Sequence, residues 1–213
     1  MSIVVSVNVG RPRTVEWFGR QVTTAIWKEP VADRVRVAGI NLDGDDQADR
    51  RVHGGSDKAV YAYAIEDYRW WAQELDQPIP PGTFGENLTT EGLDLTATLV
   101  GERWQIGATL LEASAPRLPC VKLGIRMGDA GFVDHFSRAG RHGTYLRIVD
   151  EGDVGSGDPI AVVSRPDHGL RVVDIALAYE TGEEDLIQRL TEIPDVPGDW
   201  VEWAHRQLER RSA

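Results

Sequence analysis

Cysteine is scarce in this sequence, because Cys120 is the single one among 213 residues. One thiol excludes an intramolecular disulfide, and it excludes a structural zinc cluster built from several thiolates. The spacing of the five histidines gives no zinc signature either. Cys120 is therefore the one soft ligand or thiol nucleophile that the sequence offers.

Positive charge is also in short supply, with 23 Lys and Arg against 34 Asp and Glu and a net charge of −11. A field of this sign repels phosphate, so we expect no nucleic-acid partner and no binding to anionic membranes. An anionic ligand would need a local cationic pocket. Long apolar runs are missing too, and residues 1–7 predict a first strand rather than a signal peptide. We expect a cytoplasmic protein without a membrane partner.

Motifs of three common enzyme classes are absent. The sequence contains no G-x-x-x-x-G-K-[ST] phosphate loop and no glycine-rich dinucleotide fingerprint. It also lacks the Gly-x-Ser-x-Gly turn that exposes the nucleophile of many hydrolases. Function must therefore be sought in other loops.

The chain consists mainly of short strand patterns separated by glycine turns. Strands are predicted at residues 3–9, 23–30, 59–64, 109–113, 143–149 and 160–163, a strand pair at 35–42, and hairpins at 13–22 and 101–107. Pro30 ends the 23–30 strand, and residues 151–158 are a turn-rich segment. Helical spacing marks residues 65–75, short helices are expected at 121–127 and 129–139, and the tail is helical. The aromatic residues of the 65–75 helix are expected to pack in the core. We predict a mainly β fold, a β-barrel with short peripheral helices over residues 1–170, and a small helical appendage over residues 171–213.

Cys120 follows a predicted buried strand and lies in a loop stiffened by Pro116 and Pro119. The cations Arg117 and Lys122 flank it, and nearby positive charge stabilises the thiolate. The plain alternative is that Cys120 is a small apolar filler, which is common for a free cysteine.

Other loops carry polar residues of the type that binds ligands. His53-Gly54-Gly55 with Lys58, Gly85-Glu86-Asn87, and Lys28 all lie in irregular or strand-end positions. Together with the cysteine loop they suit a phosphorylated, metal-bearing organic anion. Taken singly, His53 is equally explained as a hydrogen-bonded loop residue and Gly54-Gly55 as a turn.

Several blocks of the sequence, in the same order, resemble the MOSC domain (molybdenum cofactor sulfurase C-terminal domain). These blocks are residues 44–49, 52–55 and 57–63, Phe84-Gly85-Glu86-Asn87-Leu88, and Pro116-Arg117-Leu118-Pro119-Cys120-Val121-Lys122-Leu123. Residues 23–31 and the helical tail resemble the stand-alone YiiM-like branch of that family. The resemblance spans nearly the whole chain.

The resemblance implies a β-barrel whose pocket binds the molybdenum cofactor (molybdopterin), with Cys120 as the protein ligand to molybdenum. By the same resemblance, the cations hold the pterin phosphate and polar side chains contact the cofactor or substrate. The cations are Lys28, Arg51, Lys58 and Arg117, and the polar contacts are His53 and Asn87. Related proteins reduce N-hydroxylated compounds, so the expected substrate is an N-hydroxylated small molecule, base analogues among them.

Reduction of an N–OH group needs electrons and protons. The sequence shows no flavin, haem or iron–sulfur signature, so a separate electron-donor protein is expected as partner. His53 is the candidate acid, because its pKa lies near working pH. Two alternatives stay open: a carrier of persulfide sulfur or of the cofactor, and a metal-free hydrolase using Cys120 with His53 or His142. The oligomeric state is left open as well.

Overall fold

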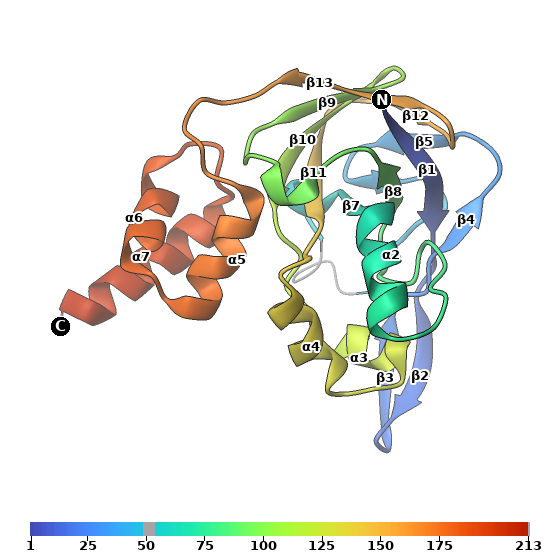
Figure 1. Cartoon of the computed structure of the whole chain (residues 1–213), viewed down its shortest axis with the longest axis horizontal. Helices are drawn as coiled ribbons and strands as arrows, with labels where there is room; N and C mark the ends of the chain where they lie inside the picture. The colour runs from blue at the N-terminus through green and yellow to red at the C-terminus, as the bar shows by residue number, and fades with distance from the viewer. Residues whose placement is uncertain (49–53, 213) are drawn as a thin grey trace.

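The computed structural model of the chain describes residues 1–48 and 54–212. Its centre is a closed barrel, because a seven-stranded run of neighbours is joined end to end by the pairing of its first and last strands (Figure 1). In order around the barrel the strands are β13 (Pro159–Ser164), β9 (Arg103–Ile106), β10 (Thr109–Ala115), β11 (Thr144–Asp150), β7 (Val60–Ala64), β8 (Leu88–Glu91) and β1 (Ser2–Val9). The predicted β-barrel is confirmed.

Most barrel neighbours run antiparallel, whereas β7 and β8 run parallel. A parallel pair needs a crossover connection, and the helix α2 (Ile65–Glu74) provides it. Outside the barrel lie β4 (Glu29–Val31) at the edge of β1, the hairpin β2 (Arg13–Trp17) and β3 (Arg20–Thr24), and a small sheet of β12 (Gly152–Val154), β5 (Val35–Ala38) and β6 (Asn41–Leu42).

The remaining helices lie in two places. The short helices α3 (Val121–Met127) and α4 (Phe132–Ala139) lie beyond the cysteine loop near α2, whereas α5 (Val172–Thr181), α6 (Glu184–Glu192) and α7 (Gly198–Ser212) form a separate group beside the barrel (Figure 1). Within residues 1–48 and 54–212 there are also two short 3₁₀ turns, η1 (Ser56–Lys58) and η2 (Leu95–Ala97). No helix in the described ranges is long and apolar enough to cross a membrane.

Two apolar clusters hold these layers together. The larger fills the barrel and continues into the helical appendage, where Ile175, Ile187 and Ala204 are fully buried. Because one cluster spans both parts, the boundary between residues 170 and 171 stays a prediction. The smaller cluster is aromatic and joins α2, α3 and α4 to β7; within it Trp71 stacks on Phe136 at 5.7 Å between ring centroids. This confirms that the aromatic residues of α2 serve packing.

Two details of the predicted secondary structure are wrong. Residues 23–30 do not form one strand: β3 ends at Thr24, residues 25–28 are irregular, and β4 contains Pro30. Pro30 is tolerated because β4 lies at a sheet edge. The segment predicted as turn-rich contains β12, which forms by pairing with β5 far away in sequence. Local sequence patterns cannot show such a pairing.

Gly143, just before β11, tests how closely the barrel strands are packed. It adopts φ +61°, and a Cβ there would lie 2.5 Å from the Ala62 carbonyl oxygen and 2.8 Å from the Tyr63 ring. Gly140 adopts a similar φ of +64° with nothing within 4 Å of its Cβ position. We expect Gly143→Ala to lose roughly 2–5 kcal/mol of unfolding free energy, since backbone strain and overpacking add.

The matched control Gly140→Ala carries the backbone strain alone and should lose about 1–2 kcal/mol. Urea unfolding of both variants measures the difference. Equal losses in the two variants would contradict the described contact around Gly143.

Candidate functional site

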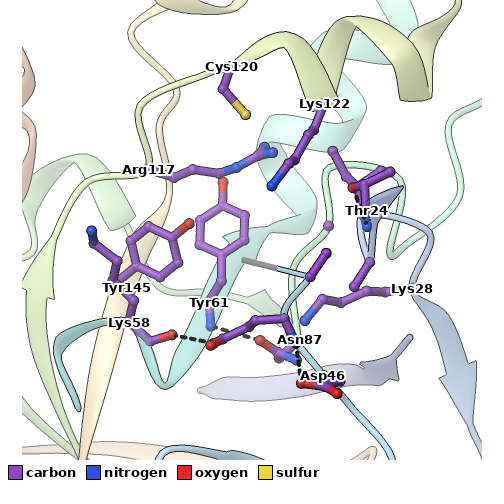
Figure 2. Close-up of a pocket in the computed structure, with 15 residues that line it drawn as sticks. Thr24, Lys28, Asp46, Lys58, Tyr61, Asn87, Arg117, Cys120, Lys122 and Tyr145 are labelled. Carbon is purple, nitrogen blue, oxygen red and sulfur yellow. Dashed lines mark hydrogen bonds between the residues drawn. The ribbon is translucent and has the colours of Figure 1, made fainter. Parts of the chain in front are cut away.

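A pocket opens beside the cysteine loop at the ends of several barrel strands (Figure 2). It holds about 570 Å³ of empty space, the part open to solvent included. Its lining residues are Thr24, Ala25, Ile26, Lys28, Asp46, Gln47, Ala48, Lys58, Tyr61, Gly85, Asn87, Arg117, Cys120, Lys122 and Tyr145. The irregular segment 25–28 therefore forms part of the wall.

Cys120 immediately precedes α3 and has an extended backbone, with φ −140° and ψ 174°. Its carbonyl accepts a hydrogen bond of 2.8 Å from the Leu123 amide, which starts the helix. The residue is partly exposed, and its sulfur points toward the pocket, with Arg117 and Lys122 nearby (Figure 2). The thiol is thus open to a ligand and lies among cations.

Arg117 is a buried cation in this wall. Its Nη1 donates a 2.8 Å hydrogen bond to the Phe84 carbonyl, and its guanidinium lies 5.4 Å from the Tyr61 ring centroid. Burial opposes its charge, but the phenols of Tyr61 and Tyr145 and the Cys120 thiol raise the pKa of Arg117 above its usual value. Arg117 therefore stays charged and is held in place.

Lys28 lines the pocket and forms an ion pair with Asp45. Its Nζ lies 2.5 Å from Oδ2 of Asp45, and both side chains are nearly removed from solvent. Burial lowers the pKa of Lys28, while the charge of Asp45 opposes that change. The pair is close to neutral, so Lys28 offers less net charge to an anion than its position alone suggests.

Asn87 lines the pocket, yet its amide is engaged by the protein. The Nδ2 group donates to Asp45 Oδ2 at 2.9 Å and to the Asn8 carbonyl at 3.3 Å. Its Oδ1 accepts from the Tyr61 amide at 3.1 Å. This side chain ties β1, β7 and the Asp45 turn together, and a ligand would meet an amide that the fold has already oriented.

The structure brings most of the predicted site residues together. Those in the pocket wall are Lys28, Lys58, Asn87, Arg117, Cys120 and Lys122. Gly54 and Gly55 do not line it; Gly55 adopts φ 99° and its carbonyl accepts from the Lys58 amide at 3.1 Å, as in a turn. Arg51 and His53 lie outside the described residues. The functional roles of all these residues stay predictions.

The sequence did not reveal two tyrosines in the pocket. Tyr61 on β7 and Tyr145 on β11 face each other across the strands, with ring centroids 5.1 Å apart. Burial raises the pKa of both phenols, so each keeps its proton at neutral pH. The Tyr61 hydroxyl donates a hydrogen bond of 2.8 Å to the His142 carbonyl. The alternation of side chains along each strand assigns each tyrosine to one face of its own strand. It does not show which face borders the pocket.

Glu86 is a fully buried carboxyl group behind the pocket wall. Its Oε1 accepts hydrogen bonds from the Tyr68 hydroxyl at 2.7 Å, the Gly82 amide at 2.6 Å and the Thr89 hydroxyl at 2.8 Å. Its Oε2 has no hydrogen-bond partner among the described residues. Burial raises the pKa of Glu86 above its usual value of 4.5, against the effect of those hydrogen bonds.

The raised pKa gives the stability of the fold a defined pH dependence. Between 4.5 and the raised pKa, folded Glu86 holds a proton that the unfolded chain releases, so stability falls as pH rises through this window. We expect Glu86→Gln to remove this fall in stability with rising pH. Relative to wild type, the variant should gain stability as the pH rises from 4.5, and the gain should level off once the raised pKa is passed.

Urea unfolding at a series of pH values measures this effect. Glu16→Gln, on the exposed face of the β2–β3 hairpin, is the matched control and should follow the wild-type curve. A Glu86→Gln curve parallel to wild type over the whole series would show that Glu86 does not titrate differently in the folded state.

The chain is similar in sequence to known proteins over most of its length. The family model of the MOSC domain matches residues 49–161. The uncharacterized protein YflK of Bacillus subtilis is 37% identical over 169 residues, covering 79% of this chain and 76% of that protein. Protein YiiM of Escherichia coli is 30% identical over 216 residues, covering 99% and 93%.

A solved structure resembles the whole chain as well. The crystal structure of YiiM from Geobacillus stearothermophilus superposes with a TM-score of 0.81 at 29% identity, covering 98% of this chain and 100% of that one. The match therefore covers the barrel and the helical appendage together. The chain belongs to the MOSC domain family, in its YiiM-like branch.

Proposed function

We propose that this protein is a molybdenum-cofactor-dependent oxidoreductase that reduces N-hydroxylated small molecules to amines, with Cys120 as the protein ligand to molybdenum. Membership of the MOSC family associates the chain with this cofactor. The observation that supports the proposal most is the placement of the Cys120 thiol in a pocket walled by Lys28, Lys58, Arg117 and Lys122, although the protein as a whole carries a net charge of −11.

The donor groups in the pocket fit this cofactor. Within the part of the chain that the structure describes, no group of three His, Cys, Asp or Glu side chains could hold a metal ion. A metal at Cys120 would therefore take one sulfur from the protein and its other ligands from an organic molecule, as the dithiolene of the cofactor provides. The phosphate of such a molecule needs cations, and Arg117 and Lys122 lie beside the thiol.

The cations differ in what they can contribute. The charge of Lys28 is balanced by Asp45 at 2.5 Å, so binding of an anion falls mainly to Arg117 and Lys122. Arg117 is buried and fixed, which suits it to hold the cofactor close to the thiol. A thiolate beside such cations binds metal at neutral pH with little cost of deprotonation.

The reaction proposed is R–NHOH + 2 e⁻ + 2 H⁺ → R–NH₂ + H₂O. When bound, the cofactor supplies a metal centre able to pass both electrons to the N–O bond. The chain holds and orients the ligand and offers hydrogen bonds; the Tyr145 phenol in the wall is protonated at neutral pH. His53 is the predicted acid for the leaving oxygen, and a separate electron-donor protein is the predicted partner.

Replacement of the thiol tests the ligand assignment. Cys120→Ser, expressed in a host that makes the cofactor, should fold normally yet lose nearly all of its molybdenum and pterin, because a hydroxyl is a poor ligand for a soft metal site. Metal content per protein, circular dichroism and hydroxylamine reduction with reduced methyl viologen measure the three properties. Full metal and activity in Cys120→Ser would rule out the assignment. Loaded wild-type protein that reduces no hydroxylamine would favour the carrier alternative.

A separate prediction concerns Lys122, one of the cations that line the pocket. Lys122→Gln should weaken retention of the cofactor, and the loss should become smaller as salt rises, because screening already weakens the charge of Lys122 in wild type. We expect about a tenfold faster loss of pterin during dialysis at low salt, the scale of one charge-assisted hydrogen bond. Arg210→Gln, exposed near the end of α7, makes the same change in net charge and should match wild type. Equal retention in both variants would remove Lys122 from the binding site.

A further inference from the structure

The hairpin of β2 and β3 extends from the barrel next to α3 (Figure 1). Its second strand ends at Thr24, which belongs to the wall of the cysteine pocket. The helix α3 borders the same pocket through Lys122, and Arg126 follows one turn later on the same face of the helix. The hairpin and α3 therefore both adjoin the cysteine pocket.

These two elements concentrate positive charge in a protein whose net charge is −11. Residues 11–28 contain four cations and one carboxylate, and α3 contains two cations and no carboxylate. The one carboxylate of the hairpin is that of Glu16, and side chains alternate between the two faces of a strand. Glu16 therefore lies on the opposite face of β2 from Arg13.

Two arginines of this region, Arg13 and Arg126, lie at the ring of Trp27. Their guanidinium carbons are 3.7 and 6.0 Å from the ring centroid. Elsewhere in the chain, Arg34 and Arg171 each form an ion pair with an acidic side chain. Among the residues that the structure describes, Arg13 and Arg126 form no ion pair, and the buried Nε of Arg126 has no hydrogen-bond partner.

The two guanidinium groups also repel each other. Burial lowers the pKa of Arg126, and the like charge of Arg13 acts in the same direction. The carboxylate of Glu29 opposes this change, with a smaller effect than that of Arg13. A carboxylate from another molecule can bind a guanidinium through two parallel hydrogen bonds, and it would offset the repulsion. The pair is thus suited to an anionic partner.

The tip of the hairpin exposes an aromatic side chain in a strained conformation. Phe18 is 81% exposed, and its φ of +48° lies in the left-handed region that side chains with a Cβ rarely adopt. Its ring meets that of Trp17 edge to face, with the centroids 4.7 Å apart. Asn is favoured at the first position of such a two-residue hairpin turn. A strained and exposed Phe is better explained by a contact with another molecule than by the stability of the turn.

We propose that the two arginines, Trp27 and Phe18 form a docking surface for an acidic electron-transfer protein. This surface, the arginine face, is defined by Arg13, Phe18, Trp27 and Arg126. Arginine and aromatic residues are the types that contribute most to binding at protein interfaces. The inference rests on the proposed reductase function for the role of the partner, which is oxidised as it supplies the two electrons of the reaction. Affinity for an acidic protein is a property of the surface itself.

Two other occupants fit the arginine face less well. A two-fold dimer that used this surface would place it against itself and bring like charges together. A nucleic acid carries regularly spaced phosphates along its whole length and is bound through many cations. A protein can instead present a few carboxylates to two arginines, with apolar contacts at Trp27 and Phe18.

Binding of defined carriers tests the surface without turnover. The probes are a plant-type [2Fe–2S] ferredoxin and a flavodoxin, both small acidic electron carriers, and calorimetry at rising salt measures their affinity. We expect wild type to bind one or both, with affinity falling as salt rises, and Arg13→Gln and Arg126→Gln each to bind about five- to tenfold more weakly. Arg210→Gln, exposed near the end of α7, makes the same change in net charge and should match wild type.

Three results of these measurements would overturn the proposal. The first is that wild type binds neither carrier. The second is that Arg210→Gln weakens binding as much as Arg126→Gln does, because the attraction would then come from overall charge. The third is that a single-stranded oligothymidylate binds wild type more tightly than either carrier.

Replacement of Phe18 separates docking from stability. Phe18→Asn removes the exposed ring and places a favoured residue in the turn, so the melting temperature should stay the same or rise. The affinity for the carrier should nevertheless fall about fivefold. Unchanged affinity would remove Phe18 from the surface. A wild-type dimer in sedimentation that Phe18→Asn dissociates would show that a second copy of the chain occupies the arginine face instead, contrary to the proposal.

Turnover distinguishes this inference from the proposed activity. With cofactor-loaded enzyme and the reduced form of the carrier that binds, Arg126→Gln should raise the KM for that carrier about five- to tenfold. With reduced methyl viologen, a small donor that needs no docking surface, the rate should change less than about twofold. An equal fall with both donors would contradict a docking role for Arg126. Methyl viologen turnover without any carrier-driven turnover would rule out electron delivery at this surface.

The two proposals can also fail separately. If no donor supports reduction of a hydroxylamine but the binding pattern of the variants holds, the reductase proposal fails and the arginine face remains a docking surface for acidic proteins. If methyl viologen drives the reaction but no acidic carrier binds, the reductase proposal stands and the docking proposal is wrong.

Discussion

The buried carboxylate of Asp45 is the interaction on which the pocket depends. It accepts from Lys28 Nζ and Asn87 Nδ2 through one oxygen, and from the Gly10 amide at 2.8 Å through the other. These contacts fasten the end of β1, the irregular segment before β4 and the loop before β8 to a single point. Loss of one partner from a buried ion pair costs roughly 3–5 kcal/mol, because the other charge is left without compensation. The shape of the wall and the stability of the fold are therefore coupled at Asp45.

The same carboxylate also sets the charge of the pocket. By balancing Lys28, it leaves the positive field mainly to Arg117 and Lys122, which lie beside the thiol (Figure 2). The net charge of −11 is distributed over the whole molecule, and salt screens exposed charges beyond about 10 Å at 0.1 M ionic strength. An anion that reaches the pocket would therefore meet Arg117 and Lys122 at close range, where screening by salt is weaker.

The features that the sequence predicted depend on local signals. Two prolines fix the cysteine loop, glycine at position 128 ends α3, and a helical repeat marks α2; all three lie where expected. The counter-ion of Lys28 and the pairing of β12 with β5 were not predictable, because each joins segments distant in the sequence. The sequence predicted that Asn87 lies at the pocket. It could not show that the Asn87 amide is already hydrogen-bonded to other parts of the protein.

The barrel closes at a seam between its first and last strands, where Ser2 pairs with Ile160 and Ile3 with Pro159. Ribosomes add about 5–20 residues per second, so β1 waits roughly 10–30 s for β13 during synthesis. Throughout that interval one edge of β1 lacks its final partner, and contacts of such high sequence separation also form slowly. Exposed strand edges are templates for pairing with other chains. The order of synthesis thus leaves this edge of the nascent barrel open to pairing with other chains until the last strand arrives, and the closed seam ends that exposure.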